Sequence, residues 1–415
     1  MPRCAVWTCA LAIMAALSAP AHAEDSGELA VDRDRQGTIA PEDPRDRRWQ
    51  DAIRPVGQLQ IWTTVWDQDV SKTADPATYG DPEADPGFTL YRARAGAEGR
   101  IRGPEGIGDD NAVYWRVWAG TGPAYDAPWA SVYGATPGFG IVDAFGRWDI
   151  STGLGLSQLT LGLQTVHFNR ERIMSSSDLL FQERAVGGEW TGAARDTGLT
   201  ASQTFLFTDR ERGPRLQATA GIYNGEIGSF LGNPNPGMMQ LGRLEFELGN
   251  AYRTWDPEGK AAFGLGVAAR NTNDVASNNQ AFVADLLARV KWVTLHVEGS
   301  TQSIQPGDTT LAPPDVLAGT TRMGGMAQLS VFVPIQGDQG VEIGGRYAFF
   351  DDDTTLTSTG DVQIIHAGAT LRDALRGVDV GAGFIHRMEA ADVGPWNNDT
   401  IRIWTQIRPT AAKVD

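Results

Sequence analysis

Cysteine is nearly absent from this 415-residue chain, whose two cysteines, Cys4 and Cys9, both lie close to the N-terminus. A positive start, an apolar stretch and an A-x-A pattern that ends at Ala23 predict a cleaved secretory signal over residues 1–23. The mature chain would then enter an oxidising compartment without any thiol. Disulfide frameworks, cysteine nucleophiles and cysteine metal sites are therefore excluded.

Long apolar runs and positive charge are also scarce. After the signal, no apolar run reaches the roughly 20 residues that a membrane-spanning helix needs. The chain has 35 Lys and Arg against 51 Asp and Glu, a net charge of −16, so it lacks the basic footprint that binding to nucleic acid requires. No metal-ligand spacing, cofactor motif or catalytic motif is visible. We therefore expect no metal, no cofactor, no nucleic-acid partner and no enzymatic activity.

What the sequence does have is alternating polarity. The stretch LYRARAGAEGRIR, residues 90–102, places charged side chains on one set of alternating positions, with Tyr91, Ile101 and several alanines between them. Such a period of two predicts a β-strand with one polar and one apolar face. In a soluble sandwich the polar face would meet solvent. In an outer-membrane barrel it would face the lumen, while Tyr91 and the alanines would face lipid.

The lengths of the connections distinguish these two architectures. About sixteen candidate strands follow one another, and long connections, such as residues 169–194 and 271–280, alternate with short ones, such as residues 254–260. A barrel with long extracellular loops and short periplasmic turns has this rhythm, whereas a sandwich has no reason to keep it. We therefore predict an all-β fold, a transmembrane antiparallel β-barrel of about 16 strands over residues 53–409. A flexible periplasmic segment at 24–52 would precede it, and a tail at 410–415 would follow.

The barrel assigns the polar face of each strand to a water-filled lumen, where rings of charge can set ion selectivity. The charged side chains predicted to line the lumen are Arg92, Arg94, Glu98, Arg100, Arg102, Arg116, Asp143, Arg147, Arg243, Glu342 and Arg346. Trp62 and Trp404 are predicted to lie in the aromatic girdles at the membrane interfaces.

Residues 166–199 contain a series of motifs. Phe168 closes a strand, Ser175-Ser176 follows, and FQER at 181–184 precedes the strand start RDTG at 195–198. Together with GIYNG at 221–225 and GVEIGGRYAFFD at 340–351, this pattern resembles the phosphate-selective porin O and P family. The resemblance implies a trimeric sixteen-stranded porin of the Gram-negative outer membrane, with its third long loop folded into the lumen.

Residues 169–194 form the third long connection and are the predicted constriction. Guanidinium and hydroxyl groups there could replace part of an ion's hydration shell. Alternatively, they could tie the loop to the barrel wall through salt bridges. The candidate residues are Arg170, Glu171, Arg172, Ser175, Ser176, Ser177, Asp178 and Arg184.

The charge pattern departs from that family. In its phosphate-selective members a lysine follows the Ser-Ser pair, and here Ser177 and Asp178 stand in its place. Acidic residues also far outnumber basic ones in the long connections, and they are densest at Asp351-Asp352-Asp353. An acidic mouth attracts cations and repels anions. Such loops could also bind divalent cations that bridge lipopolysaccharide, although a solvated acidic loop is the simpler interpretation.

The sequence thus predicts an outer-membrane porin that passes small hydrophilic solutes and ions by passive diffusion through a charged, loop-constricted channel. The expected partners are membrane lipid, lipopolysaccharide, small ions or solutes, and further copies of the chain in a homotrimer. A phosphate- or anion-selective porin is the alternative within transport. Outside transport, one alternative function is that of a structural or adhesive barrel without an open pore. A third alternative is an outer-membrane lipid hydrolase.

Overall fold

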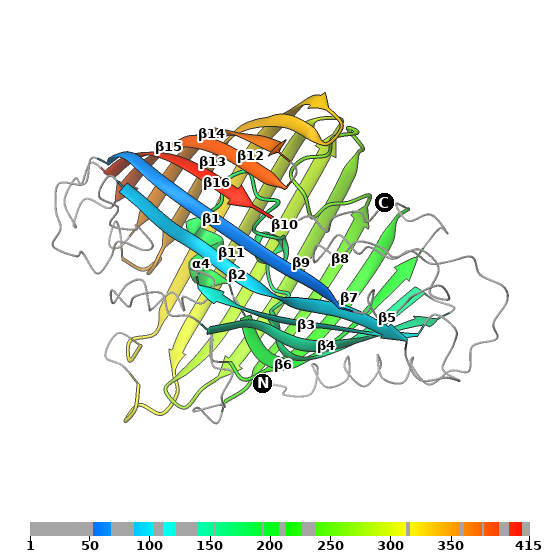
Figure 1. Ribbon diagram of the computed structural model, residues 1–415. Helices are drawn as coiled ribbons and strands as arrows, with labels where there is room; N and C mark the ends of the chain where they lie inside the picture. The colour runs from blue at the N-terminus through cyan, green and yellow to red at the C-terminus, as the bar shows by residue number, and fades with distance from the viewer. Residues whose placement is uncertain are drawn as a thin grey trace.

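Sixteen β-strands make up almost all of the regular structure in the computed structural model (Figure 1). It describes residues 53–67, 87–102, 111–121, 140–152, 155–192, 195–206, 213–225, 237–312, 316–356, 361–375, 377–389 and 398–408. The predicted signal, the segment at 24–52 and the tail at 410–415 lie outside these ranges. Within them, no helix is long and apolar enough to cross a membrane.

The strands follow one another along the chain, and two short helices lie between β5 and β6. The first eight strands are β1 (Arg54–Asp67), β2 (Gly87–Arg102), β3 (Ala112–Thr121), β4 (Gly140–Thr152), β5 (Gly155–Thr165), β6 (Arg195–Leu206), β7 (Arg215–Tyr223) and β8 (Met239–Leu248). The other eight are β9 (Ala262–Asn273), β10 (Ser277–Val290), β11 (Val293–Pro306), β12 (Thr320–Gln336), β13 (Gln339–Asp351), β14 (Val362–Leu375), β15 (Val378–Glu389) and β16 (Asn398–Ile407). The helices are α3 (Arg170–Ile173) and α4 (Val186–Thr191).

The sheet closes on itself. Each strand pairs antiparallel with its neighbours in the chain, and β1 pairs with β16, where Trp62 lies opposite Trp404. Closure leaves no strand edge with unpaired backbone groups, which is the condition for a sheet in a lipid environment. The predicted all-β transmembrane antiparallel barrel of about 16 strands is confirmed, including the strand predicted near residue 200, which is β6.

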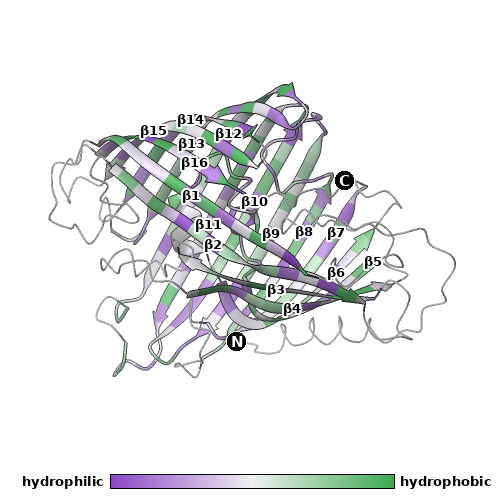
Figure 2. Cartoon of the chain, viewed as in Figure 1, coloured by the Kyte–Doolittle hydropathy of each residue, from purple (hydrophilic) through white to green (hydrophobic). Residues whose placement is uncertain are grey.

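The period-two pattern places polar side chains inside the barrel. On β8, the inner face carries Met239, Leu241, Arg243, Glu245 and Glu247, and all five are buried. The alternate positions carry Leu244, Phe246 and Leu248, which are exposed on the outer face. Figure 2 shows the same alternation of polar and apolar residues along many strands. A soluble protein would place these two faces the other way round.

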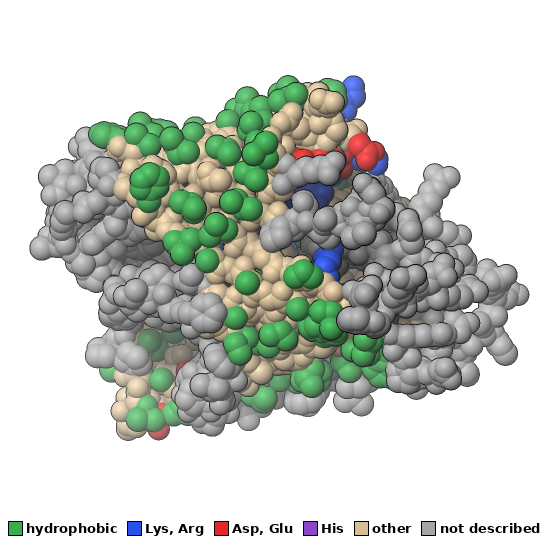
Figure 3. Space-filling model, viewed as in Figure 1, with side chains coloured by type: hydrophobic (Ala, Val, Ile, Leu, Met, Phe, Trp, Pro, Cys, Tyr) green, Lys and Arg blue, Asp and Glu red, His purple; other side chains and the backbone are tan. Residues whose placement is uncertain are grey.

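The outer wall is apolar over most of the strands. On the face shown in Figure 3, apolar side chains are spread across the wall and charged ones are few. Large apolar side chains such as Leu161, Val267 and Phe282 are about half exposed or more. An apolar wall of this kind matches a lipid environment, because in water so large an apolar patch would promote association.

Three aromatic side chains lie elsewhere than predicted. Trp62 and Trp404 are buried inside the barrel, in a cluster with Leu180 and Phe181, and not at an interfacial girdle. Tyr91 was predicted to face lipid, yet its ring stacks on Trp62 with a centroid distance of 3.4 Å. A bulge between Gln60 and Ile61 in the pairing of β1 with β2 is the cause, because the extra residue on β2 interrupts the alternation of faces.

Two connections also differ from the prediction. Residues 271–280 were expected to form a long loop, but β9 and β10 continue into this region and only residues 274–276 join them. Asn273, Asn278 and Asn279 suggested a loop, although polar residues are compatible with the ends of long strands. Conversely, residues 249–261, expected to contain a short turn, form a longer segment that folds inward.

The orientation of the outer wall predicts a depth-dependent cost for a buried charge. Val267 lies near the middle of β9 on the outer face, and Val290 lies at the turn end of β10. We expect Val267→Arg to lower the free energy of unfolding in lipid vesicles by about 2–4 kcal/mol, and Val290→Arg to lower it by about 1 kcal/mol or less. Urea titration of the vesicle-embedded protein measures both values, and equal costs would contradict a membrane-spanning wall.

The inward loop and the arginine cleft

Residues 166–192, between β5 and β6, form a segment that we call the inward loop. It contains α3 and α4, and most of its residues are buried although they belong to no strand. The loop crosses the lumen, so that its side chains reach β1, β8, β11, β13 and β14 on other parts of the wall. Figure 1 shows α4 enclosed by strands. The predicted inward folding of the third loop is confirmed.

Arg170 is the central attachment of the inward loop. Its guanidinium lies 2.7 Å from Glu245 on β8 and 2.8 Å from Asp285 on β10, and its side chain is completely buried. Arg243 on β8 shares the same carboxylates, lies 2.7 Å from Asp285 and donates a hydrogen bond to the carbonyl of Phe168 at the start of the loop. Each charge therefore has partners, which a buried charge requires.

The charges in this cluster balance. Arg215 lies 2.6 Å from Glu247, so that three arginines face three carboxylates behind the loop. Burial lowers the pKa of the Arg170 guanidinium, but the nearby Glu245 and Asp285 carboxylates outweigh this effect and raise the pKa above its ordinary value. Arg170 is consequently charged at every physiological pH. Arg170 and Arg243 of this cluster hold the loop, whereas Arg215 also lines the open space of the lumen.

Further contacts attach the loop along its length. Asn169 donates to Glu298 on β11 at 2.6 Å, and the backbone amide of Glu171 donates to the same carboxylate at 3.2 Å. Arg346 on β13 donates to the Glu171 carboxylate at 3.3 Å and to the carbonyl of Glu183 at 3.0 Å. The barrel wall and the loop thus each supply both donors and acceptors. Hydrogen bonds and ion pairs along its length hold the loop in place, in addition to its two connections to the strands.

The far part of the loop reaches the wall near the barrel closure. Arg372 on β14 donates to the carbonyl of Leu179 at 2.8 Å, and Gln58 on β1 donates to the Ser176 hydroxyl at 3.0 Å. The helix α4 lies flat on β12, where Gly187 meets the backbone of Gly325. A Cβ atom at Gly187 would lie only 2.3 Å from that backbone nitrogen, so only glycine permits this approach.

A second segment enters the lumen from the end of the barrel that carries the short turns, and it packs against the inward loop. Residues 249–261, between β8 and β9, form what we call the inward turn. Its Ala251 and Tyr252 pack in a buried cluster with Met174 and Leu179 of the loop, and Trp255 stacks on Phe332 of β12 at 5.4 Å. The inward loop and the inward turn together occupy the side of the lumen that β8 to β16 enclose, and the loop also contacts β1.

The open space lies on the other side. An open cleft runs between the inward loop and the wall formed by β1 to β7. We call it the arginine cleft, because among the described residues seven arginines line it and Asp143 is the one acidic side chain on its lining. The arginines are Arg94, Arg116, Arg147, Arg172, Arg184, Arg195 and Arg215. Its other polar lining includes Gln158, Thr160, Gln164, His167, Ser175, Ser176, Ser202, Thr204 and Gln217.

Several of these arginines are held by carboxylates that lie behind them. Arg116 lies 2.6 Å from Glu98, and Arg147 lies 2.7 Å from Asp149, while neither carboxylate lines the cleft. Arg195 pairs with Asp143 at 2.7 Å. The pairs orient the guanidinium groups, and in the first two the negative partner lies off the lining. Guanidinium groups therefore outnumber carboxylates on the lining of the cleft.

The structure separates the eight predicted loop residues into two groups. Arg172, Ser175, Ser176 and Arg184 line the arginine cleft. The other four face away from it, toward the wall or the loop itself: Arg170, Glu171, Ser177 and Asp178. Arg184 donates to the carbonyls of Glu171 and Met174, which carry no formal charge. Attachment of the segment to the wall is thus observed, Ser176 takes part in it while it also lines the cleft, and the constriction stays a prediction.

The predicted lumen charges divide in the same way. Arg94, Arg116, Asp143 and Arg147 line the cleft, whereas Arg243 and Arg346 hold the inward loop. The remaining inner-face residues support these groups: Arg92 donates to the carbonyl of Gln182, Glu98 pairs with Arg116, Glu342 pairs with Arg372, and Arg100 is half-buried. The side chain of Arg102 lies outside the described part of the structure.

The sequence pattern missed two arginines of the cleft and the inward turn. Arg215 begins its strand and shares alternate positions with the inner-face Gln217 and Thr219 of β7, so the alternation could have identified it. Arg195 was assigned only to a family motif, and the alternation did not indicate it, because it falls on the opposite set of positions from the buried Thr200 and Thr204 of β6. Nothing in the sequence indicated that residues 249–261 fold inward, because Tyr252 and Trp255 also suit an interfacial turn.

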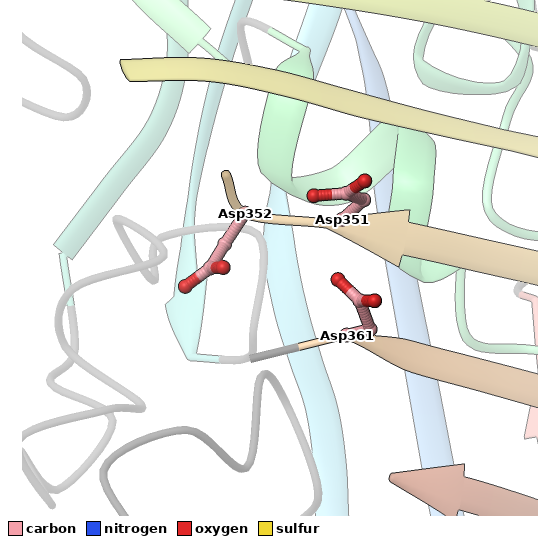
Figure 4. A group of neighbouring side chains, drawn as sticks. All are labelled: Asp351, Asp352 and Asp361. Carbon is pink, nitrogen blue, oxygen red and sulfur yellow. The ribbon is translucent and has the colours of Figure 1, made fainter. Parts of the chain in front are cut away.

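The acidic residues near Asp351 form a small group at the end of the barrel. Asp351 ends β13, and Asp361 precedes β14, so that strand pairing brings these two together with Asp352 (Figure 4). One oxygen of each lies within 4.8 Å of the others. All three are partly exposed, and acidic groups at such positions commonly lie this close in water without an ion. The arrangement therefore does not identify a metal site.

Comparison with known proteins shows which solved structures have a similar fold. No protein-family model matches the sequence, and no curated protein matches it by sequence either. Among solved structures, OmpT of Vibrio cholerae superposes with a TM-score of 0.52 at 11% identity and covers 86% of this chain and 97% of that one. An anion-selective porin from Comamonas acidovorans gives 0.52 at 12% identity, covering 86% and 99%. OmpF of Salmonella typhi in a complex with daunomycin gives 0.53 at 10% identity, covering 88% and 99%.

These likenesses show a porin-type barrel fold. At such low sequence identity they indicate neither a substrate nor a subfamily. Membership of the phosphate-selective O and P family therefore stays a prediction. The prediction that the chain is not an enzyme is wrong as an exclusion. OmpT, one of the matched structures, is described simply as an outer membrane protein, so a chain that shares its fold is not thereby excluded from catalysis.

The Arg170 cluster predicts a large effect from a single substitution. Arg170→Gln removes one cation and leaves Glu245 and Asp285 with an unbalanced buried charge. We expect a loss of about 3–5 kcal/mol in the free energy of unfolding, or faster protease cleavage within the inward loop if only the loop detaches. Arg253→Gln is the matched control, because Arg253 is 31% exposed and lies 3.5 Å from Asp178. We expect it to cost less than about 1 kcal/mol. Equal behaviour of the two variants would contradict the assigned role of Arg170.

Proposed function

We propose that this protein is an outer-membrane channel through which small hydrophilic solutes diffuse passively, with a preference for anions. The arginine cleft supports this proposal more than any other feature. Among the residues that the structure describes, seven arginines and one carboxylate line it, and the inward loop forms one of its sides. Fixed guanidinium groups at a constriction lower the electrostatic energy of an anion and raise that of a cation.

The length of the cleft fits a passage. Its lining on β5 extends from Gln158 near the short-turn end to Thr165 near the inward loop. At about 3.4 Å per residue this is about 24 Å of strand, or about 18 Å of height after the usual strand tilt. The apolar band of an outer-membrane barrel is about 25 Å tall. The polar lining of the cleft on β5 therefore covers most of the membrane thickness.

Anion preference contrasts with the overall charge of −16. Many acidic side chains inside the barrel, such as Glu245, Glu247 and Asp285, pair with arginines behind the inward loop and do not line the cleft. Others, such as Asp352, lie in the connections. Selectivity follows the charges that a solute meets at the narrowest part, because screening in salt solution weakens those more than about 10 Å away.

Several finer predictions belong to the same proposal. The signal over residues 1–23 would export the chain, lipid and lipopolysaccharide would surround the barrel, and three copies would associate as the family resemblance implies. Phosphate selectivity is the narrower alternative, although Ser177 stands where the phosphate-selective members have a lysine, and no lysine lines the cleft among the described residues. A structural barrel with no open pore is the alternative from another class, since the inward loop and inward turn fill one side of the lumen.

Planar-bilayer recording of the purified protein tests the proposal. We expect unitary currents and a reversal potential on the anion side in a KCl gradient. Arg172→Gln removes one charge from the loop side of the cleft, and we expect it to lower the anion-to-cation permeability ratio by about fivefold, which corresponds to about 1 kcal/mol for one charge at short range.

The control removes negative charge from a connection at the barrel end. The double variant Asp352→Asn/Asp353→Asn changes the rim and leaves the cleft intact, so we expect almost no change in reversal potential. A cation-side potential in the unmodified protein, or a larger shift from the rim variant than from Arg172→Gln, would show that the acidic rim governs selectivity. Absence of any unitary current would favour the structural barrel.

A further inference from the structure

We propose that the arginine cleft contains a binding site for organic anions that carry an apolar or aromatic body, built around Arg94 and Trp118. This inference rests on the proposed function and adds to it a substrate class. It distinguishes the cleft from a site for inorganic phosphate, which has no apolar surface to match. The site would slow a preferred solute at the narrow part of the passage and so select it from a mixture.

Arg94 is the first reason. Its side chain is 94% buried on β2, it lines the cleft, and its Nε and Nη2 atoms have no hydrogen-bond partner among the described residues. The charged groups that act on it are mainly positive: Arg92, Arg184 and Arg195, with Asp143 as the one carboxylate among them. Asp143 is itself paired with Arg195 at 2.7 Å. A buried cation in such surroundings lacks an anion, and a carboxylate can take both free donors at once.

Trp118 supplies a third donor beside Arg94. In the pairing of β2 with β3, Trp118 lies opposite Gly96, and Arg94 lies opposite Gly120, so the two side chains are diagonal neighbours on the inner face. The indole Nε1 of Trp118 is buried and has no hydrogen-bond partner within the described structure. Arg116 lies over the indole ring at 4.9 Å and holds it in place. Buried indole nitrogens normally find a partner, so this one is available to a ligand.

The apolar part of the site comes from both sides of the cleft. Trp118 and Phe145 line it on the barrel wall, and Ile173 and Met174 line it on the inward loop. Phe145 lies opposite Arg116 in the pairing of β3 with β4, so aromatic and cationic groups are interleaved across the wall. This combination of convergent donors and apolar side chains is typical of small-molecule sites. A hydrated inorganic ion would gain nothing from the apolar half.

Isothermal titration calorimetry with the purified full-length protein in detergent tests the site directly. Benzoate is the probe, because it carries one carboxylate on one aromatic ring. Acetate supplies the charge without the ring, benzyl alcohol supplies the ring without the charge, and inorganic phosphate represents the alternative anion. We expect benzoate to bind more tightly than all three, since only benzoate uses both parts of the site.

Variants then assign the binding to named residues. We expect Arg94→Gln to weaken benzoate on the order of tenfold, as the loss of a charge-assisted hydrogen bond predicts. Trp118→Phe keeps a ring and removes Nε1, and we expect it to weaken benzoate by about threefold. Arg322→Gln, at a half-buried arginine of β12 outside the cleft, is the matched control and should leave benzoate binding unchanged. Heat-dependent mobility on gels verifies that each variant is folded.

Bilayer recording separates the failure of this site from the failure of the channel. We expect benzoate to reduce the chloride current, and Arg94→Gln to weaken this block by the same factor as binding. Currents that benzoate does not affect, phosphate binding as tight as benzoate binding, or equal losses from Arg94→Gln and Arg322→Gln would each overturn the site and leave the channel in place. Benzoate binding that depends on Arg94 without any unitary current would support the site and overturn the channel.

Discussion

The pairing of buried charges is the constraint on which the interior of this barrel depends. A loop that enters the lumen removes charged side chains of the wall from water, and each must then find an opposite charge or a hydrogen bond. Arg170 and Arg243 satisfy Glu245 and Asp285 in this way, and Arg346 satisfies Glu171. Because these pairs join the inward loop to several strands, the position of the loop follows from electrostatics as much as from its connection to β5 and β6.

This pairing also divides the lumen. On the side of β8 to β16, Arg170 of the inward loop pairs with carboxylates of the wall, and Met174 and Leu179 of the loop pack with Tyr252 of the inward turn. On the side of β2 to β7, the carboxylates that pair with Arg116 and Arg147 lie behind the guanidinium groups. A chain with a net charge of −16 therefore lines this cleft mainly with arginines, and its total charge is a poor guide to the charge of its interior.

Local periodicity predicted the strands because it depends only on neighbouring residues. All sixteen strands formed where alternating polarity indicated them, and β6 formed despite a weak pattern. The prediction failed where pairing between strands mattered. The bulge that turns Tyr91 inward arises from the register of β1 against β2, and Trp62 and Trp404 are buried because the loop residue Phe181 packs on them. Neither fact can be read from one strand alone.

The sequence by itself thus determined the barrel, its strand order and the presence of arginines on the inner face, since a period of two and the lengths of most connections follow from adjacent residues. Tertiary structure alone decided which arginines face open space. Arg170 and Arg172 are two residues apart, yet the first pairs with Asp285, 115 positions away, while the second lines the cleft. Charge pairing acts through space between residues distant in the chain, so only the folded barrel separates the groups that hold the loop from those that meet a solute.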